Sequence, residues 1–364
     1  MLYTIVFYLI LFIVVKNSRG NYTKAIKAAC MVIAIYLGLR YDYCPDYSAY
    51  QMLFEMFTSP NFEYTEIVHV EYGWYLINKW CEPIGYFGFV FLTSCIFAYG
   101  IYLLMSIYVK SIHLVLITIW GIVSAGGFTT LLSAQRQMLV TAIFMIAYRY
   151  ILYERIHGKF DILKFRTLIY FTIISLCSCF HRSAIFLLVI PFIFLLPKRS
   201  NTVILGIFII GIAFILIGDT MIAPMFQSLA ADNDFYDYIN FSNKYAGTVT
   251  FLQGLMWILQ VYYLLKVYKN NNMETSEMAA VLLSLFAILI TLSGYYLNQV
   301  GRIAHYIYIF TFLSIAIVVK YNKKNDNKIY LLANYIWIVW NLLKVFTINV
   351  GTYQEYKTIF KVLL

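Results

Sequence analysis

The chain has 364 residues, of which 62% are hydrophobic and 12% are charged, and its formal net charge is +10. A soluble domain carries about 25% charged residues, so this composition excludes an ordinary soluble protein. Apolar runs long enough to cross a bilayer recur from end to end, which predicts a single polytopic, all-α membrane domain over residues 1–364. The positive charge therefore indicates membrane topology rather than nucleic-acid binding.

In chain order, the apolar segments predict about twelve transmembrane helices. The first segment is short. It lacks a basic leader and a small-residue cleavage site, which favours a retained helix over a cleaved signal peptide. The segments lie near residues 2–15, 24–39, 86–109, 111–126, 134–152, 166–181, 183–197, 202–218, 250–268, 278–296, 303–320 and 329–347.

Charges in the connecting segments predict the orientation. Of the 27 lysines and arginines, 17 lie in connectors on one side: residues 16–27, 110, 154–166, 197–200, 266–270 and 320–328. By the positive-inside rule this side faces the cytoplasm. Twelve of the 17 acidic residues lie on the other side, mostly in two long loops at residues 40–85 and 219–249. Any chemistry is therefore expected at the extracytoplasmic face.

Both long loops are predicted to carry short helices. Residues 46–57 place apolar and aromatic side chains at helical spacing after a Pro-Asp start, and residues 71–80 have the same amphipathic character. Residues 219–249 are rich in Asp, Asn and Tyr and allow another short helix. Cys44 and Cys81 share the first loop, where a disulfide and two unpaired thiols are both compatible with the sequence.

Four arginines lie near the extracytoplasmic ends of predicted spans. Arg40 ends the second span, Arg136 opens the fifth, Arg182 lies between the sixth and seventh, and Arg302 opens the eleventh. One interpretation is snorkelling or ion pairing with outer acids, such as Asp46 for Arg40. The other is an anion site, because the planar guanidinium group binds phosphate through two parallel hydrogen bonds.

Two histidines accompany these arginines. His181 directly precedes Arg182, and His305 shares a helical face with Arg302. Histidine is a candidate acid or base near neutral pH, although a histidine at a helix end is more often a structural hydrogen-bond donor. The sequence has no P-loop, GxSxG, GxGxxG or HExxH motif. It therefore favours a transferase without cofactor or metal, whose donor is activated as a lipid-linked pyrophosphate.

Aromatic residues in the first loop suggest sugar binding. Most of the 34 tyrosines suit an aromatic membrane belt. In the loop, however, Tyr47, Tyr50 and Trp74 stand among carboxylates such as Glu71. Rings stack on the C–H faces of sugars while carboxylates bind their hydroxyls. These four residues, together with His305, are the predicted sugar contacts.

Five segments, in this order, resemble the EpsG-like family of exopolysaccharide and O-antigen polymerases, the Wzy type. They are LRYDYCPDYSAYQMLF (39–54), EYGWYLINKW (71–80), SAQRQMLVTAIFMIAYRYI (133–151), FHRSAIFLLVIPFI (180–193) and GRIAHYIYIF (301–310). The pattern covers most of the chain. The sequence has Cys44-Pro45 where family members often have a glycine before the aspartate, so the local backbone is expected to differ there.

The resemblance implies a fold similar to the GT-C class of lipid-linked glycosyltransferases. It also implies transfer of a growing glycan from one undecaprenyl-pyrophosphate carrier to a repeat unit on another, at the outer face of the bacterial inner membrane. On this chain the four arginines become candidates to bind pyrophosphate. Asp42, Asp46 and His181 become candidates to act as the base or to position the acceptor hydroxyl, and the sequence does not choose between Asp46 and His181.

Two other functions share this pattern. An O-antigen ligase uses the same donor with a different acceptor, and a lipid-linked oligosaccharide flippase also needs cations for pyrophosphate. A flippase is expected to carry charges near the membrane midplane and often two similar halves. The sequence shows charges at the outer rim and no repeat, which ranks the polymerase first, the ligase second and the flippase third. Whether a chain-length regulator is a partner stays open.

Overall fold

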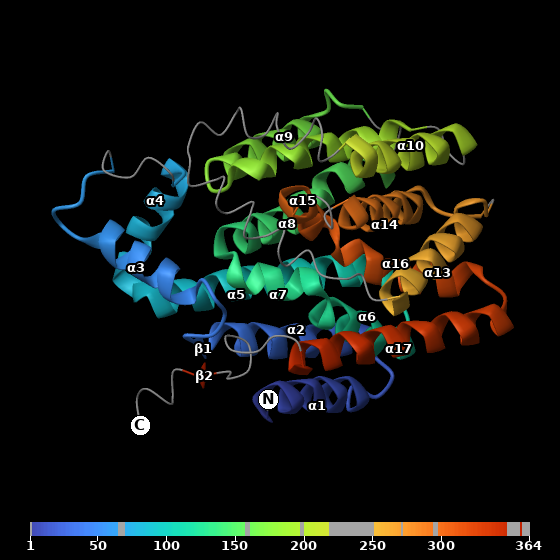
Figure 1. The fold of residues 1–364 in the computed structure, drawn as a ribbon, viewed down its shortest axis with the longest axis horizontal. Coiled ribbons are helices and arrows are strands. Elements are labelled where there is room, and N and C mark those ends of the chain that lie inside the picture. The colour runs from blue at the N-terminus through green and yellow to red at the C-terminus, as the bar shows by residue number, and fades with distance from the viewer. Residues whose placement is uncertain are drawn as a thin grey trace. The chain divides into compact units, whose positions relative to one another are not determined.

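In the computed structural model, the structure describes residues 2–64, 70–156, 161–196, 200–217, 251–270, 272–293, 298–347 and 357–358 (Figure 1). Nearly all of these residues are helical, which confirms the all-α prediction; the exception is one pair of two-residue strands. The helix predicted within residues 219–249 lies outside the described residues. Two compact units divide the chain, Met1–Pro191 with Ile338–Leu364, and Phe192–Trp337.

The first unit contains the N-terminal helices and both strands. Its elements are α1 (Leu2–Lys16), α2 (Tyr22–Gly38), β1 (Arg40–Tyr41), α3 (Tyr47–Thr58), α4 (Tyr72–Trp80), the 3-10 helix η2 (Glu82–Ile84), α5 (Gly85–Tyr108), α6 (Ile112–Ser124), α7 (Gly126–Ser133), α8 (Gln135–Ile156), α9 (Phe165–Ser178), most of the 3-10 helix η3 (Arg182–Leu195), and β2 (Lys357–Thr358). The end of α17 (Lys324–Thr347) also belongs to it.

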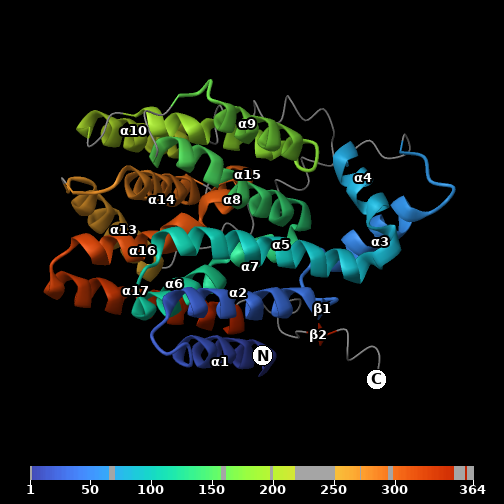
Figure 2. The ribbon, with the colours of Figure 1, turned by 180° about the vertical axis from the view of Figure 1, so that it is seen from behind.

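Five helices of this unit pack in sequence, α1 on α2, α2 on α5, α5 on α8 and α8 on α9 (Figure 1, Figure 2). Small residues allow the close approaches. A Cβ on Gly38 of α2 would lie 2.4 Å from Phe91 Cδ2 of α5. A Cβ on Gly100 of α5 would lie 2.8 Å from Met145 Cε of α8. Glycine at helix contacts is typical of helices that pack within membranes.

The loop at residues 40–85 folds at the end of this unit where α2 ends and α5 begins (Figure 1). It carries α3 and α4, at the positions of the two short helices expected from the sequence. Strand β1 follows α2 directly and pairs antiparallel with β2, with Arg40 opposite Thr358. The strand pair was not predicted, because two residues of strand leave no periodic pattern in a sequence.

The second unit is built around α14 (Thr275–Ser293), which contacts α10 (Asn201–Ile217), α13 (Phe251–Tyr268), α15 (Asn298–Ile307) and α16 (Ile309–Tyr321). Buried polar side chains join α13 to the first part of α17. Tyr330 OH donates to Gln260 Oε1 at 2.7 Å, and Gln260 Nε2 donates to Asn334 Oδ1 at 2.5 Å. Hydrogen bonds of this kind hold helices together where water is absent.

Several helices expose apolar faces. Helix α1 buries Phe7, Leu11 and Val15 and exposes Ile5, Leu9 and Ile13. An exposed apolar stripe of this kind suits lipid better than water. Among the described residues, Glu82–Tyr108 and Thr275–Leu292 are long and apolar enough to cross a membrane, and α6 with α7 make a third candidate if they form one span bent by 52°. These helices are compatible with a membrane protein, and the count of about twelve spans stays a prediction.

Candidate functional site

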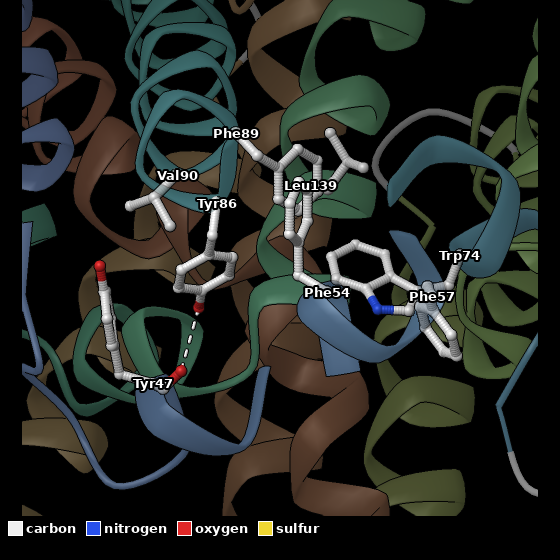
Figure 3. Packing of buried hydrophobic residues seen from close by; sticks show 8 residues of the cluster. All are labelled: Tyr47, Phe54, Phe57, Trp74, Tyr86, Phe89, Val90 and Leu139. Atoms are coloured by element: carbon white, nitrogen blue, oxygen red, sulfur yellow. Dashed lines mark hydrogen bonds between the residues drawn. The ribbon is translucent and has the colours of Figure 1, made fainter. Parts of the chain in front are cut away.

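An aromatic cluster fixes the short helices of the first loop. It consists of Tyr47, Phe54, Phe57, Trp74, Tyr86, Phe89, Val90 and Leu139, contributed by α3, α4, α5 and α8 (Figure 3). Tyr86 OH donates to the Tyr47 carbonyl at 3.1 Å, the dashed line in Figure 3. Tyr47 is 2% and Trp74 1% exposed, so two of the predicted sugar contacts serve as packing residues in this structure. The third ring, Tyr50, is half-buried and packs edge-on against Trp74.

Glu71 lies at the centre of a cluster of charged groups beside these helices. It is the residue before the first turn of α4. Its Oε2 accepts a hydrogen bond from Arg136 Nη1 at the start of α8. Its Oε1 accepts from the backbone N–H of Arg182 at 3.0 Å and lies 3.7 Å from His181 Nδ1. Three distant stretches of sequence therefore meet at one carboxylate.

The electrostatics of this cluster keep Glu71 ionised. Burial disfavours the charged form, but the His181 imidazole, the Arg136 charge and the Arg182 N–H oppose it and lower the pKa of Glu71 to about 2. The Arg136 guanidinium also reaches Tyr50, with Nε 3.5 Å from the phenol oxygen. Arg136 is thus held between a carboxylate and a phenol, as the ion-pairing interpretation of this arginine expected.

A glycine allows α4 to approach the 179–182 turn. A Cβ on Gly73 would lie 2.5 Å from the Cys179 carbonyl oxygen, closer than any side chain allows. Cys179 follows the last residue of α9, and η3 starts three residues later with Arg182. Arg182, predicted between the sixth and seventh spans, is thus the first residue of η3, and it is exposed.

Arg40 has a different environment from Arg136. It is fully buried, and its Nε, Nη1 and Nη2 atoms have no hydrogen-bond partner in the described part of the chain. The ion pair with Asp46 does not form among these residues, because Asp46 Oδ2 instead accepts from Ser133 Oγ at 2.7 Å. A buried guanidinium without a hydrogen-bond partner is costly, because its contacts with water are lost and nothing described replaces them.

Sequence reasoning missed three polar residues near this end of the first unit. Ser133 binds Asp46, and Gln135 Nε2 donates to Tyr86 OH at 2.8 Å. Tyr86 in turn links Gln135 to α3 through the Tyr47 carbonyl. Ser133 and Gln135 both precede Arg136 in the segment SAQRQ, so the position of that arginine at a helix start was the available signal.

The segment after Arg40 has an unusual backbone. Asp42 has φ of 43° and Cys44 φ of 89°, in the left-handed region that glycine adopts most easily. The backbone was expected to differ from the family pattern at Cys44-Pro45, and in the structure Cys44 has this strained conformation. Cys44 and Cys81 are both free thiols, so the alternative of a disulfide is wrong for this structure. Burial raises the pKa of Cys44 to about 12, which keeps its thiol neutral.

The remaining predicted residues are dispersed. Asp42 and Asp46 are both exposed, in the segment between β1 and α3. Arg302 and His305 belong to α15 in the second unit, where His305 is half-buried and the side chain of Arg302 lies outside the description. The described residues contain no group of three or more His, Cys, Asp or Glu side chains arranged to hold a metal ion. Independence from metals remains a prediction.

One comparison with known proteins identifies a family. The model of the EpsG family matches residues 24–358, which include every charged residue of the cluster around Glu71. No curated protein and no solved structure matches the chain.

Proposed function

The chain belongs to the EpsG family, and from that premise we propose that it is a polysaccharide polymerase, a glycosyltransferase acting on lipid-linked oligosaccharides. The donor is a growing glycan on undecaprenyl pyrophosphate, and the acceptor is a repeat unit on a second carrier. The enzyme lies in the bacterial inner membrane with its site on the periplasmic or outer side. A chain-length regulator is the other partner of interest.

The observation that carries this proposal is the convergence on Glu71. Arg136 and the adjacent pair His181 and Arg182 come from two separate segments and contact Glu71 at one end of the first unit, Arg182 through its backbone N–H. The same end holds Arg40, whose buried guanidinium has no hydrogen-bond partner in the described residues. Cations and a histidine at one place match the needs of a reaction in which pyrophosphate leaves.

In the proposed reaction an acceptor hydroxyl attacks the anomeric carbon of the donor and inverts it. The bond from that carbon to the pyrophosphate oxygen breaks, and the leaving group takes the electron pair. Arg40, Arg136, Arg182 and Arg302 are the proposed contacts to pyrophosphate. Because its negative charge grows along the reaction, fixed guanidinium groups stabilise the transition state more than the ground state. No metal is required when arginines neutralise this charge.

The hydroxyl proton goes to a base, for which His181 and Asp46 are the proposed candidates, with Asp42 positioning the acceptor. His181 lies in the charged cluster, 3.7 Å from Glu71. Asp46 is exposed and accepts a hydrogen bond from Ser133. Proximity to Arg136 and Arg182 favours His181, because the base must stand close to the carbon from which pyrophosphate departs.

The test is the chain length of the polysaccharide made by a strain that lacks this gene and carries a plasmid copy at matched expression. Wild type is expected to give a ladder of lengths. Arg136→Ala and His181→Ala are expected to leave single repeat units, since loss of one such group costs about 10²–10³ in rate. Arg149→Ala, an exposed arginine on the same helix, is the matched control and is expected to leave the ladder intact.

The same strain separates the rival functions. A null strain that still exports single repeat units supports polymerisation. A null strain without even single-repeat product indicates a ligase or a flippase instead. A normal ladder from Arg136→Ala would remove Arg136 from the pyrophosphate site, and a normal ladder from His181→Ala would leave Asp46 as the proposed base.

A further inference from the structure

Glu71 does not present a free carboxylate to a sugar. Its side chain is 11% exposed, and both of its oxygens are engaged by groups of the protein. Oε2 holds Arg136, and Oε1 holds the Arg182 N–H. The prediction that Glu71 binds sugar requires it to break these contacts. A carboxylate held in this way is suited to orient the side chains beside it, those of Arg136 and His181.

The neighbour of greatest interest is His181. Its Nδ1 is the ring nitrogen that faces Glu71, 3.7 Å from Oε1. A carboxylate facing Nδ1 favours the tautomer with the proton on that nitrogen, which leaves the lone pair on Nε2. The distance is longer than a hydrogen bond, but contacts of this kind are often loose before substrate binds.

We propose that Glu71 is the positioning residue of the site, which orients His181 as the base and holds Arg136 in place for the pyrophosphate. This inference rests on the proposed function and deepens it, because it chooses His181 over Asp46. The pairing is the same in kind as the carboxylate–histidine pairs that orient general bases in other enzymes.

The proton balance of the step is simple. The acceptor oxygen bonds to the anomeric carbon as the bond to pyrophosphate breaks, and its proton passes to Nε2 of His181. The imidazolium formed carries a positive charge, and the Glu71 carboxylate stabilises it. Arg136 meanwhile faces the departing pyrophosphate. After the product leaves, Nε2 returns its proton to solvent.

The experiment measures kcat and KM for a purified enzyme in lipid, with a labelled lipid-linked repeat unit as substrate. Glu71→Gln keeps the size of the side chain and an oxygen for the Arg182 N–H, and removes the charge. We expect kcat to fall at least about 10–100-fold with KM little changed, the loss seen when a carboxylate that orients a metal-ligating histidine is removed. Glu71→Asp keeps the charge and is expected to retain more activity than Glu71→Gln.

A double-mutant cycle shows whether Glu71 acts through His181. If it does, Glu71→Gln slows the His181→Gln enzyme much less than it slows wild type, because only its contact with Arg136 is then left to lose. A merely structural role for Glu71 predicts that the two losses multiply. If the activity of His181→Gln is too low to measure, the test is whether Glu71→Gln lowers kcat or raises KM. The matched control is Glu55→Gln, an exposed carboxylate of α3 that accepts from Gln51.

Three results overturn the inference. A rise in KM for the acceptor with kcat unchanged returns Glu71 to sugar binding. A rise in KM for the donor alone means that Glu71 acts through Arg136 only. Full activity of Glu71→Gln beside an inactive His181→Gln removes the positioning role and leaves the proposed function standing. Full activity of His181→Gln also overturns the inference, because it removes His181 as the base, and it leaves Asp46 in that role of the proposed function.

Discussion

At the scale of single residues, Arg40 is the position where the stability of the fold and the proposed function conflict most. A buried guanidinium without hydrogen-bond partners destabilises the fold, because its water contacts are lost and nothing described replaces them. Arg40→Met replaces it with an apolar side chain of similar length. We expect the variant to be as stable as wild type or more stable, by up to about 1–4 kcal/mol, as for buried ionic groups elsewhere.

The same variant is expected to lose polymerisation, by about 10²–10³ in rate. Thermal unfolding in detergent and the polysaccharide ladder measure the two effects side by side. Arg149→Met serves as the control, since this exposed arginine should alter neither. A less stable but fully active Arg40→Met protein would mean that Arg40 supports the fold and binds no anion.

Glu71 predicts a dependence of stability on pH. Its pKa of about 2 lies below the ordinary value, so its contribution is complete above about pH 4.3 and is lost as the pH falls through about 2. Glu71→Gln removes the charge that Arg136 faces and should cost about 1–3 kcal/mol at neutral pH. The difference in stability between wild type and Glu71→Gln should stay level from about pH 8 to 5 and shrink below about pH 4.3. A difference that vanishes by pH 6 contradicts the lowered pKa.

At the scale of elements, the position of α4 depends on one glycine. Gly73→Ala forces a Cβ against the Cys179 carbonyl oxygen, so α4 must move away from the 179–182 turn. Because Glu71 precedes α4, its contacts to His181 and Arg182 should lengthen together. We expect a loss of activity close to that of Glu71→Gln, although no charged residue changes.

Gly126→Ala is the control for this prediction. It also adds a Cβ to a glycine at a helix start in the same unit, but nothing lies within 4 Å of that Cβ. Its activity and its thermal stability should match wild type. If Gly73→Ala were equally active, α4 could retreat without disturbing Glu71, and the site would not depend on this contact.

The elements also show what sequence reasoning captures. The helical spacing in residues 46–57 and 71–80 was sufficient to predict α3 and α4, because amphipathic periodicity is a local property. The partners of Arg136 were not predictable in the same way. Glu71 lies 65 residues away in the chain, and nothing near either residue encodes their contact. Likewise, the sequence around Trp74 and Tyr47 suits stacking on a sugar. Only the packing of Trp74 on Phe89 and of Tyr47 on Tyr86 places both rings inside the aromatic cluster.

At the scale of the whole molecule, composition was the strongest guide. The apolar content predicted an all-α membrane protein, and the order of five weak segments predicted the EpsG family, which the family match confirms. Charge in the connectors gave an orientation that no contact within the chain tests, because a fold has the same internal contacts whichever way it faces. The site of the reaction depends on that orientation, so the last prediction concerns it.

Single cysteines on the two predicted sides of the membrane test the orientation. Cys81 lies in the predicted outer loop, exposed Cys179 lies near the outer end of the predicted span 166–181, and exposed Lys323 lies in a basic connector on the predicted inner side. Three proteins are compared, each with one cysteine: Cys81, Cys179 or the residue introduced by Lys323→Cys. A membrane-impermeant maleimide added to intact spheroplasts should label the Cys81 and Cys179 proteins only. Lys323→Cys should react after permeabilisation.

The rate of maleimide labelling at Cys81 should depend on pH more steeply than the labelling rate of a fully exposed thiol. Burial raises the pKa of Cys81, and the thiolate is the reactive form, so labelling should accelerate from about pH 7 to 9. Labelling of Lys323→Cys in intact spheroplasts, with none at Cys81 or Cys179, would reverse the orientation. The cluster around Glu71 would then face the cytoplasm, away from any glycan delivered to the outer leaflet, and polymerisation there would be ruled out.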